Sequence, residues 1–217
     1  EFNESIPFVD NTFETDFFRI RFDMTSGSII SLVDKRTQKE YVRKDGKLNT
    51  LRMYLEDKKG GMKSWVINKI NGIEEVTKVS GVKVIENGPV RACVESVKTW
   101  GRSRFIERAY IYRSYPRIDY DMEVHWLETG SDSTDSPMLK AIFPLNIDQP
   151  RFYCQVPFDV VERPVDGKIN GKEAPLNQRH ADAYGIEAEK KIGQEVPAQH
   201  WVDVTDGSAG IALLNRT

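Results

Sequence analysis

Three acidic side chains alternate along one segment and are the residues best spaced for catalysis. Asp119, Asp121 and Glu123 occupy every second position within Tyr115–Trp126. On a β-strand, such residues share one face and are about 6–7 Å apart. A retaining glycosidase needs two carboxylates about 5 Å apart, so the spacing is compatible with glycoside hydrolysis. The alternative is the solvated or domain-facing side of an amphipathic strand. We favour it because nothing in the segment desolvates or pairs the carboxylates in an obvious pocket.

Histidine spacing does not indicate a metal site. His125, His180 and His200 are isolated in the sequence, and only His180 has a second ligand type nearby, at Asp182 on a polar segment. Zinc is bound by several His, Cys or Asp ligands brought together, so we interpret these histidines as surface residues. The chain also lacks G-x-S-x-G, a P-loop and G-x-G-x-x-G, the usual marks of acyl-transfer and nucleotide chemistry. We therefore assign no catalytic residue and no metal ligand.

Aromatic side chains could stack on sugar rings, and the tryptophans are the candidates: Trp65, Trp100, Trp126 and Trp201. Trp126 continues an apolar alternation and is predicted to lie in the core with Ile118, Tyr120, Met122 and Val124. Trp201 shares a strand face with Asp203, and the pattern does not determine whether that face is buried. Trp65 follows a Gly-rich loop and has the best chance of exposure, although burial is the more common state of tryptophan. The carbohydrate-binding residues therefore remain unassigned.

The elements that must position these residues are predicted to be strands. Alternating apolar and polar residues indicate strands over the ranges Phe17–Phe22, Ile29–Val33, Leu51–Glu56, Val82–Glu86, Val90–Val97, Arg104–Tyr112, Tyr115–Trp126, Leu139–Leu145, Ala198–Val204 and Gly210–Leu214. Turn residues separate them, and no segment keeps a helical apolar stripe for three turns. Arg163–Gln194 is rich in Gly, Pro and charge and is predicted to be a long surface excursion. This pattern predicts an all-β fold, a large antiparallel β-sandwich.

Bulk composition excludes several classes of function. The chain has 217 residues with 31 basic and 33 acidic side chains and a net charge of −2, which is no basis for expecting nucleic acid or an anionic membrane as a partner. No apolar run approaches the roughly 18 residues of a membrane span. Cys93 and Cys154 lie in apolar, strand-like contexts and are predicted to be buried free thiols. Residues 1–217 are expected to form one β-sandwich domain, an excised piece of a longer protein.

Six segments resemble one known family in order and approximate spacing. They are Gly27–Lys35 (G-S-I-I-S-L-V-D-K), Glu86–Ala92 (E-N-G-P-V-R-A), Tyr115–Trp126 (Y-P-R-I-D-Y-D-M-E-V-H-W), Met138–Ile147 (M-L-K-A-I-F-P-L-N-I), Gln155–Pro164 (Q-V-P-F-D-V-V-E-R-P) and Glu195–Asn215 (E-V-P-A-Q-H-W-V-D-V-T-D-G-S-A-G-I-A-L-L-N). Together they resemble the C-terminal β-domain of family 38 glycoside hydrolases, the α-mannosidases. The resemblance covers nearly the whole chain and implies a supersandwich of the galactose-mutarotase-like type.

The resemblance also implies how the parent enzyme would work. In such enzymes a preceding catalytic domain carries the nucleophilic Asp, the acid/base Asp and the His/Asp zinc ligands, and these motifs are absent from the 217 residues. The parent is expected to be a zinc-dependent retaining α-mannosidase in the cytoplasm. This chain is expected to bind no cofactor, to be inactive alone, to pack on the catalytic domain and to help shape the sugar-binding cleft. Carbohydrate is the other expected partner.

The end of the chain departs from the family pattern. Family members usually continue past A-L-L-N with a K-Y-G-like turn and further strands, whereas this chain stops at Arg216-Thr217. We therefore expect a truncated domain with an uncovered sheet edge, and self-association through that edge or through the face that would pack on the missing domain.

Two alternatives remain. A stand-alone carbohydrate-binding module would show exposed, coplanar aromatics around a groove. A mutarotase-like enzyme would need a His/Glu pair in the sandwich cleft, and none of the three histidines resembles that pattern.

Overall fold

The computed structural model describes residues 4–59, 67, 69–165, 168–169, 172–173 and 198–215, and every regular element within them is a β-strand. No helix in this part of the chain is long and apolar enough to cross a membrane. The chain divides into two compact units, one of Glu1–Gly61 with Asn68–Asn146 and one of Met62–Ile67 with Ile147–Thr217. The predicted all-β, antiparallel fold is confirmed, and a single domain over residues 1–217 stays a prediction.

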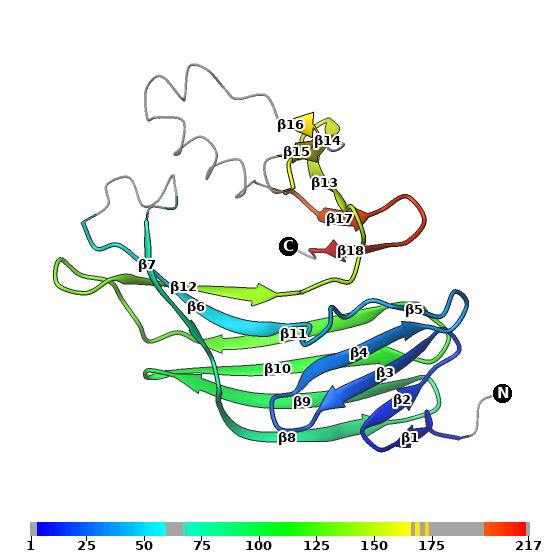
Figure 1. The fold of residues 1–217 in the computed structure, drawn as a ribbon. Coiled ribbons are helices and arrows are strands. Elements are labelled where there is room, and N and C mark those ends of the chain that lie inside the picture. The colour runs from blue at the N-terminus through cyan, green and yellow to red at the C-terminus, as the bar shows by residue number, and fades with distance from the viewer. Residues whose placement is uncertain are drawn as a thin grey trace. The chain divides into compact units, whose positions relative to one another are not determined.

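The described part of the first unit forms three antiparallel sheets (Figure 1). One has the order β1-β2-β3-β4-β5, with bounds Phe8–Val9, Thr12–Glu14, Phe18–Asp23, Ser28–Asp34 and Lys39–Glu40. Another has the order β11-β10-β9-β8, with bounds Ile118–His125, Ser103–Tyr112, Arg91–Trp100 and Lys78–Asn87. The third has the order β12-β6-β7, with bounds Ser136–Ile142, Thr50–Glu56 and Ile70–Glu75.

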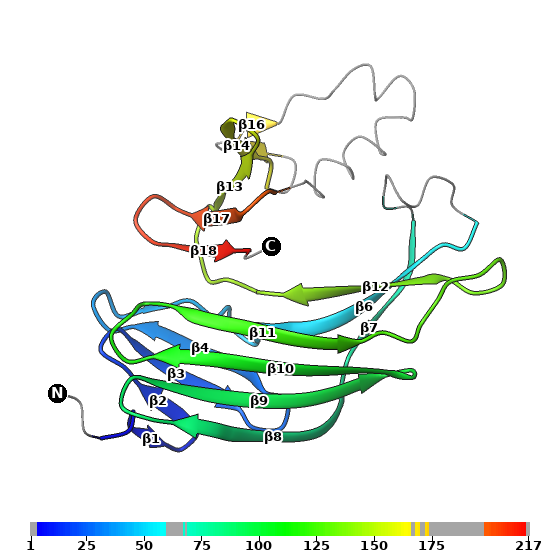
Figure 2. The ribbon, with the colours of Figure 1, turned by 180° about the vertical axis from the view of Figure 1, so that it is seen from behind.

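The first two of these sheets face each other as a sandwich. In Figure 1, β3 and β4 lie in front of β9 and β10, and the reverse view of Figure 2 shows the opposite order. The turn between β3 and β4 approaches β9 closely at Gly27, where φ is +76° and a Cβ would lie 2.4 Å from the Cβ of Ser96. A side chain at Gly27 would therefore force this turn away from β9, and its backbone conformation is one that L residues rarely adopt.

The core continues from the sandwich to the third sheet. Leu51 and Met53 of β6 pack with Phe105 of β10 and with Val76, all at most 5% exposed. Four partly buried apolar residues cover this cluster, one from β6 itself and three from β9, β11 and β12: Leu55, Trp100, Met122 and Leu139. The indole N–H of Trp100 also donates to Glu74 Oε2 at 2.9 Å. This core holds β6, β9, β10 and β11 together, so their outward faces are fixed relative to one another.

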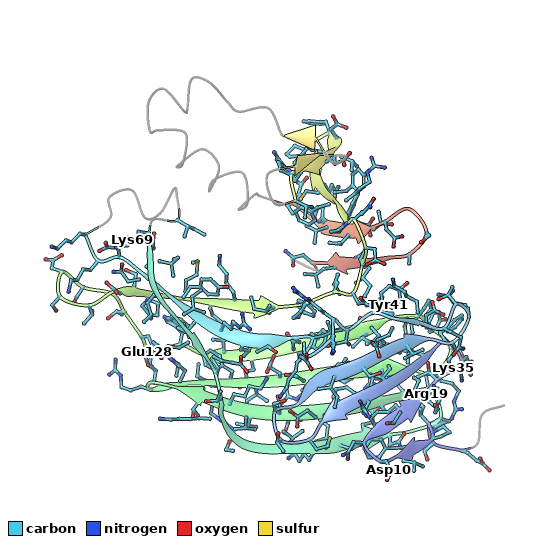
Figure 3. All side chains as sticks on the ribbon, viewed as in Figure 1. Asp10, Arg19, Lys35, Tyr41, Lys69 and Glu128 are labelled. Carbon is cyan, nitrogen blue, oxygen red and sulfur yellow. The ribbon has the colours of Figure 1, made fainter. Side chains whose placement is uncertain are left out.

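Ion pairs and caps fasten the two ends of the sandwich. At one end, the carboxylate of Glu14 contacts Arg19 Nε at 2.6 Å and Lys35 Nζ at 3.5 Å. At the other, Glu128 accepts a hydrogen bond from the backbone N–H of Arg102 at 2.6 Å and closes the turn between β9 and β10. Figure 3 labels Arg19, Lys35 and Glu128 and shows these opposite positions. Ion pairs at one end and a carboxylate–backbone hydrogen bond at the other thus stabilise the two ends of the sandwich.

The described part of the second unit is built around one antiparallel sheet of order β14-β13-β17-β18. Its strands have the bounds Asp159–Arg163, Arg151–Val156, Trp201–Thr205 and Gly210–Leu214. A further pair joins β15 (Lys168–Ile169) to β16 (Lys172–Glu173). These two short strands fall within the predicted surface excursion Arg163–Gln194, most of which lies outside the described residues.

All ten strands predicted from alternation are present with small shifts of their bounds. The structure adds strands that the pattern did not indicate: β1, β2, β5, β7 and the hairpin β13–β14 with the short pair β15–β16. In that hairpin, Pro157 and Phe158 form the turn, and Phe158 has a φ of +68°. This turn was missed because its sequence lacks the Asn-Gly or Asp-Gly signal that usually marks a two-residue hairpin.

Candidate functional site

The three acidic residues of β11 lie on the outer face of its sheet and are ion-paired. Arg108 Nη1 lies 3.8 Å from Asp121 Oδ2 and 3.9 Å from Glu123 Oε2. Asp119 is held by the guanidinium of Arg117 and accepts a hydrogen bond from the phenol of Tyr112 at 2.9 Å. The side chains of Asp121 and Glu123 are at least half exposed. The face is a solvated, charge-compensated surface, as the favoured interpretation of the alternation predicted.

A row of alternating charge crosses this sheet from edge to edge. Lys83 of β8, Glu95 of β9, Arg108 of β10 and Asp121 of β11 stand opposite one another in register. Glu95 contacts Lys83 Nζ at 3.3 Å and Arg108 Nε at 2.9 Å. Burial opposes ionisation of Glu95, but the hydrogen bonds from Lys83 and Arg108 outweigh it and lower the pKa of this carboxyl. The row therefore favours the ionised form of Glu95, which makes this carboxyl a poor proton donor.

The histidines are placed as surface residues where the structure describes them. His125 is exposed and its Nε2 lies 2.8 Å from Glu123 Oε1. His200 is exposed just before β17. His180 and Asp182 lie outside the described residues. Among the described residues, no group of three or more His, Cys, Asp or Glu could hold a metal ion, so these residues do not fit the zinc expected in the parent and no reaction step here is assigned to it.

The predicted burial of Trp126 is wrong. Its side chain is 38% exposed, and Val124 before it is 42% exposed, although Met122 packs on the core as predicted. The reason is position: Trp126 lies just beyond the end of β11, the edge strand of its sheet, so part of its surface stays open to solvent. There it meets the ring of Phe105 edge-on, with centroids 6.5 Å apart.

The other tryptophans and the cysteines are placed as follows. Trp100 and Trp201 are half-buried, and Trp65 lies outside the described residues. Cys93 and Cys154 are buried free thiols, as predicted. Burial raises the pKa of the Cys93 thiol to about 11, so near neutral pH this thiol is protonated and a poor nucleophile.

A buried polar cluster lies on the inner face of the sandwich, and the sequence analysis missed it. Glu107 of β10 forms an ion pair with Lys98 of β9, and each side chain is at most 5% exposed. Asn49 Nδ2 donates to Glu107 Oε1 at 2.8 Å, and Ser96 Oγ lies 3.5 Å from Oε2. The signal was available, because the alternation of β10 places Glu107 on the same face as Phe105 and Ala109.

This inner cluster is compensated and closed to solvent. The carboxylate of Glu107 faces one cation and two neutral groups, which satisfies both of its oxygens. The phenol of Tyr120 packs in the same interior, where burial and then the charge of Glu107 raise its pKa. A charge in such a place is stable only while its partners stay. We assign the cluster to holding the loop before β6 against the sheet rather than to catalysis.

The sheet of the second unit carries a different set of side chains on one face. Tyr153 of β13 stands opposite Asp203 of β17, and strand alternation puts Gln155 and Trp201 on the same side. All four are half-buried. Burial raises the pKa of Asp203, and no hydrogen bond or ion pair contributes to that shift. The sequence analysis had placed Trp201 and Asp203 together on one face, and the register confirms it.

Comparison with known proteins identifies relatives over most of the chain. The model of the glycosyl hydrolases family 38 C-terminal domain matches residues 13–217. Alpha-mannosidase G of Dictyostelium discoideum is 23% identical over 198 residues, which cover 88% of this chain and 16% of that protein. Our chain therefore spans about a sixth of the length of this curated relative.

Two crystal structures from Enterococcus faecalis share the fold. An alpha-mannosidase of strain V583 superposes with a TM-score of 0.67 at 15% identity, covering 95% of this chain and 23% of that one. A protein in glycosyl hydrolase family 38 superposes with a TM-score of 0.57 at 14% identity, covering 71% and 21%. With the family match over residues 13–217, these findings show that the chain belongs to the family of glycosyl hydrolase family 38 C-terminal domains.

Proposed function

We propose that this chain is the C-terminal β-domain of a retaining, zinc-dependent α-mannosidase, in which it packs on the catalytic domain and helps shape the sugar-binding cleft. The observation that carries the proposal is the family match over residues 13–217 in a chain that spans only 16% of a mannosidase relative. The remaining length of such a relative is where the two catalytic carboxylates and the metal ligands would be. On this proposal the parent acts in the cytoplasm, and residues 1–217 bind no cofactor.

Exposed apolar side chains of the second unit support a role in packing. Phe158 is fully exposed at the tip of the hairpin β13–β14, and Val160 beside it is 48% exposed. Leu213 and Leu214 are exposed on β18, the terminal strand of its sheet. Such residues gain free energy when another surface covers them. A catalytic domain would cover them in the parent, and a second copy would cover them in the isolated chain, so light scattering of the isolated chain should show self-association.

Turnover of an aryl α-mannoside tests the proposal. The purified chain should not hydrolyse it above the buffer rate, with or without zinc, whereas the longer protein that contains this chain should. Removal of residues 147–217 from that longer protein should abolish or strongly lower the activity. Steady turnover by the chain alone that disappears in Asp119→Asn or Asp121→Asn would contradict the proposal, as would a longer protein with no activity on α-mannosides.

A second candidate is a stand-alone carbohydrate-binding module. The observation that favours it is the face of the second unit that carries two aromatic rings together with Gln155 and Asp203. The two candidates differ in the longer protein: a module needs no neighbouring domain, and deleting it should lower affinity for polymeric substrate while leaving turnover of a small aryl mannoside unchanged.

A further inference from the structure

We propose that the face of the sheet β14-β13-β17-β18 that carries Tyr153, Gln155, Trp201 and Asp203 is a binding subsite for a neutral pyranose ring. The four residues come from two neighbouring strands. Tyr153 and Asp203 are directly opposite in the register, and Gln155 and Trp201 each flank the next pair, Cys154 and Val202. Side chains two residues apart on a strand are about 6–7 Å apart, so the four form a patch about the size of one sugar ring.

One polar atom of this patch lacks the partner that its burial demands, and a carboxyl beside it is partly desolvated. Gln155 Oε1 is buried and has no hydrogen-bond partner. The carboxyl of Asp203 is desolvated, and burial is the sole cause of its raised pKa. Buried polar groups are normally satisfied, and each exception calls for an explanation. An unsatisfied amide oxygen beside a partly desolvated carboxyl on one sheet face indicates a ligand that donates hydrogen bonds.

The aromatic residues restrict the kind of ligand. Trp201 offers an apolar ring face with a polar handle, the indole N–H. The guanidinium of Arg151 lies over the ring of Tyr153, 5.1 Å from its centroid, so Tyr153 contributes mainly its phenol. A pyranose has one face of C–H groups and a rim of hydroxyls, so it can stack on a ring while its hydroxyls donate to a carboxylate and an amide oxygen. The neighbouring charges on this face, Arg151 and Glu162, neutralise each other at 2.9 Å. Nothing in this group of residues selects for an anion.

The opposite face of the same sheet has a different character. Alternation places Phe152, Val204 and Ile211 there, with the buried thiol of Cys154. That face is largely apolar, although Arg163 stands opposite Phe152 on it and its Nε is buried without a hydrogen-bond partner. The face of Trp201 and Asp203 combines rings with acceptors. Val160 and Leu214 stand opposite Gln155 and Trp201 in the register, so exposed apolar residues border the face of Trp201 and Asp203 as well. This inference deepens the proposed function and rests on it for the choice of a mannosyl ligand.

The test is binding of methyl α-D-mannopyranoside and α-mannobiose to the 217-residue chain, followed by ligand-observed NMR and calorimetry. We expect millimolar affinity for the wild type and at least tenfold weaker binding for Asp203→Asn and for Trp201→Ala. Asp203→Asn keeps the size of the side chain, so it remains informative if Trp201→Ala does not fold. Matched controls are Asp121→Asn and Trp126→Ala, which change the same residue types in the first unit and should leave affinity unchanged.

Three results would overturn the subsite: no binding by the folded wild type, equal affinity in a folded Asp203→Asn variant, or binding of tetramethylammonium in place of the mannosides. Failure of the subsite is distinguishable from failure of the proposed function. The first is measured by binding to the isolated chain, and the second by mannoside turnover in the longer protein.

Discussion

Replacing one member of the buried Lys98–Glu107 pair should be among the most destabilising changes in the first unit. Both side chains are at most 5% exposed, so bulk water cannot screen the charge left behind in Glu107→Gln. Removing one partner of such a pair typically costs about 3–5 kcal/mol. Glutamine keeps an oxygen that can accept from Asn49, which isolates the loss of charge from the loss of shape.

The double variant separates charge compensation from packing. Lys98→Met alone should cost about 3–5 kcal/mol for the same reason. Lys98→Met combined with Glu107→Gln removes both charges and should cost only about 1–3 kcal/mol, the range for an imperfectly satisfied polar group. The two single costs should therefore not add, and the coupling between the sites should reach at least about 2 kcal/mol.

Urea unfolding followed by hydrogen exchange of the β9 and β10 amides measures this effect in the first unit alone. With a slope of about 2 kcal/mol per molar urea, a loss of about 4 kcal/mol lowers the midpoint by about 2 M. Asp121→Asn is the control, because its side chain is 64% exposed and its contact with Arg108 spans 3.8 Å; its midpoint should not move measurably. A loss below about 1 kcal/mol for Glu107→Gln, or additive single costs, would refute the reasoning.

Three further predictions follow from burial and backbone geometry. Gly27→Ala should lower the free energy of unfolding by at least about 2 kcal/mol in a urea melt, because the backbone at this position is left-handed and a Cβ would overlap Ser96. Gly81→Ala is the control, since a Cβ there meets open space, and its stability should change little. Equal effects of the two variants would contradict this prediction. Trp126→Ala should cost about 1–2 kcal/mol, below the about 3–5 kcal/mol of a fully buried Trp, and a larger loss would mean a deeper position. Burial raises the pKa of the Cys93 thiol from 9.0 to about 11, so the folded state favours the protonated thiol. This preference contributes fully to the free energy of unfolding below pH 9, and the contribution is lost as pH rises toward 11. Stability in alkaline melts should fall in that window, and Cys93→Ala should reduce the slope; an unchanged slope would count against it.

Local alternation predicted the strands well, because a two-residue period survives in the sequence whatever lies across the sheet. It placed Asp119, Asp121 and Glu123 on one face and Trp201 with Asp203 on one face, and the register shows both. Alternation could not show which strands or loops pack beside a given strand. Burial is set by pairing between distant residues, so the pattern that extended the apolar face to Trp126 could not show that its strand ends at a sheet edge.

The polar sites were harder to predict for the same reason. Alternation places Glu107 on the inner face, but it does not reveal Asn49, the hydrogen-bond partner 58 residues earlier. Gln155 gave no signal at all, because its strand ends in a Pro-Phe turn that does not look like a hairpin. Nor could the sequence show that Asp203 is desolvated without a cation. The charge and hydrogen bonding of Glu107, Gln155 and Asp203 depend on partners that are distant in the sequence or missing. The order of residues along the chain does not show either.

The pairing of β12 with β6 sets the order in which the first unit can be made. Ser136–Ile142 hydrogen-bonds with Thr50–Glu56, and β7 to β11 all lie between them in the chain. On a ribosome, β6 must therefore wait for more than eighty residues of further synthesis before its second neighbour exists. Closing so long a loop makes folding slow and leaves the strand edge open during translation. β6 carries the charged residues Arg52 and Glu56, and charge on an unpaired strand disfavours pairing with a wrong strand.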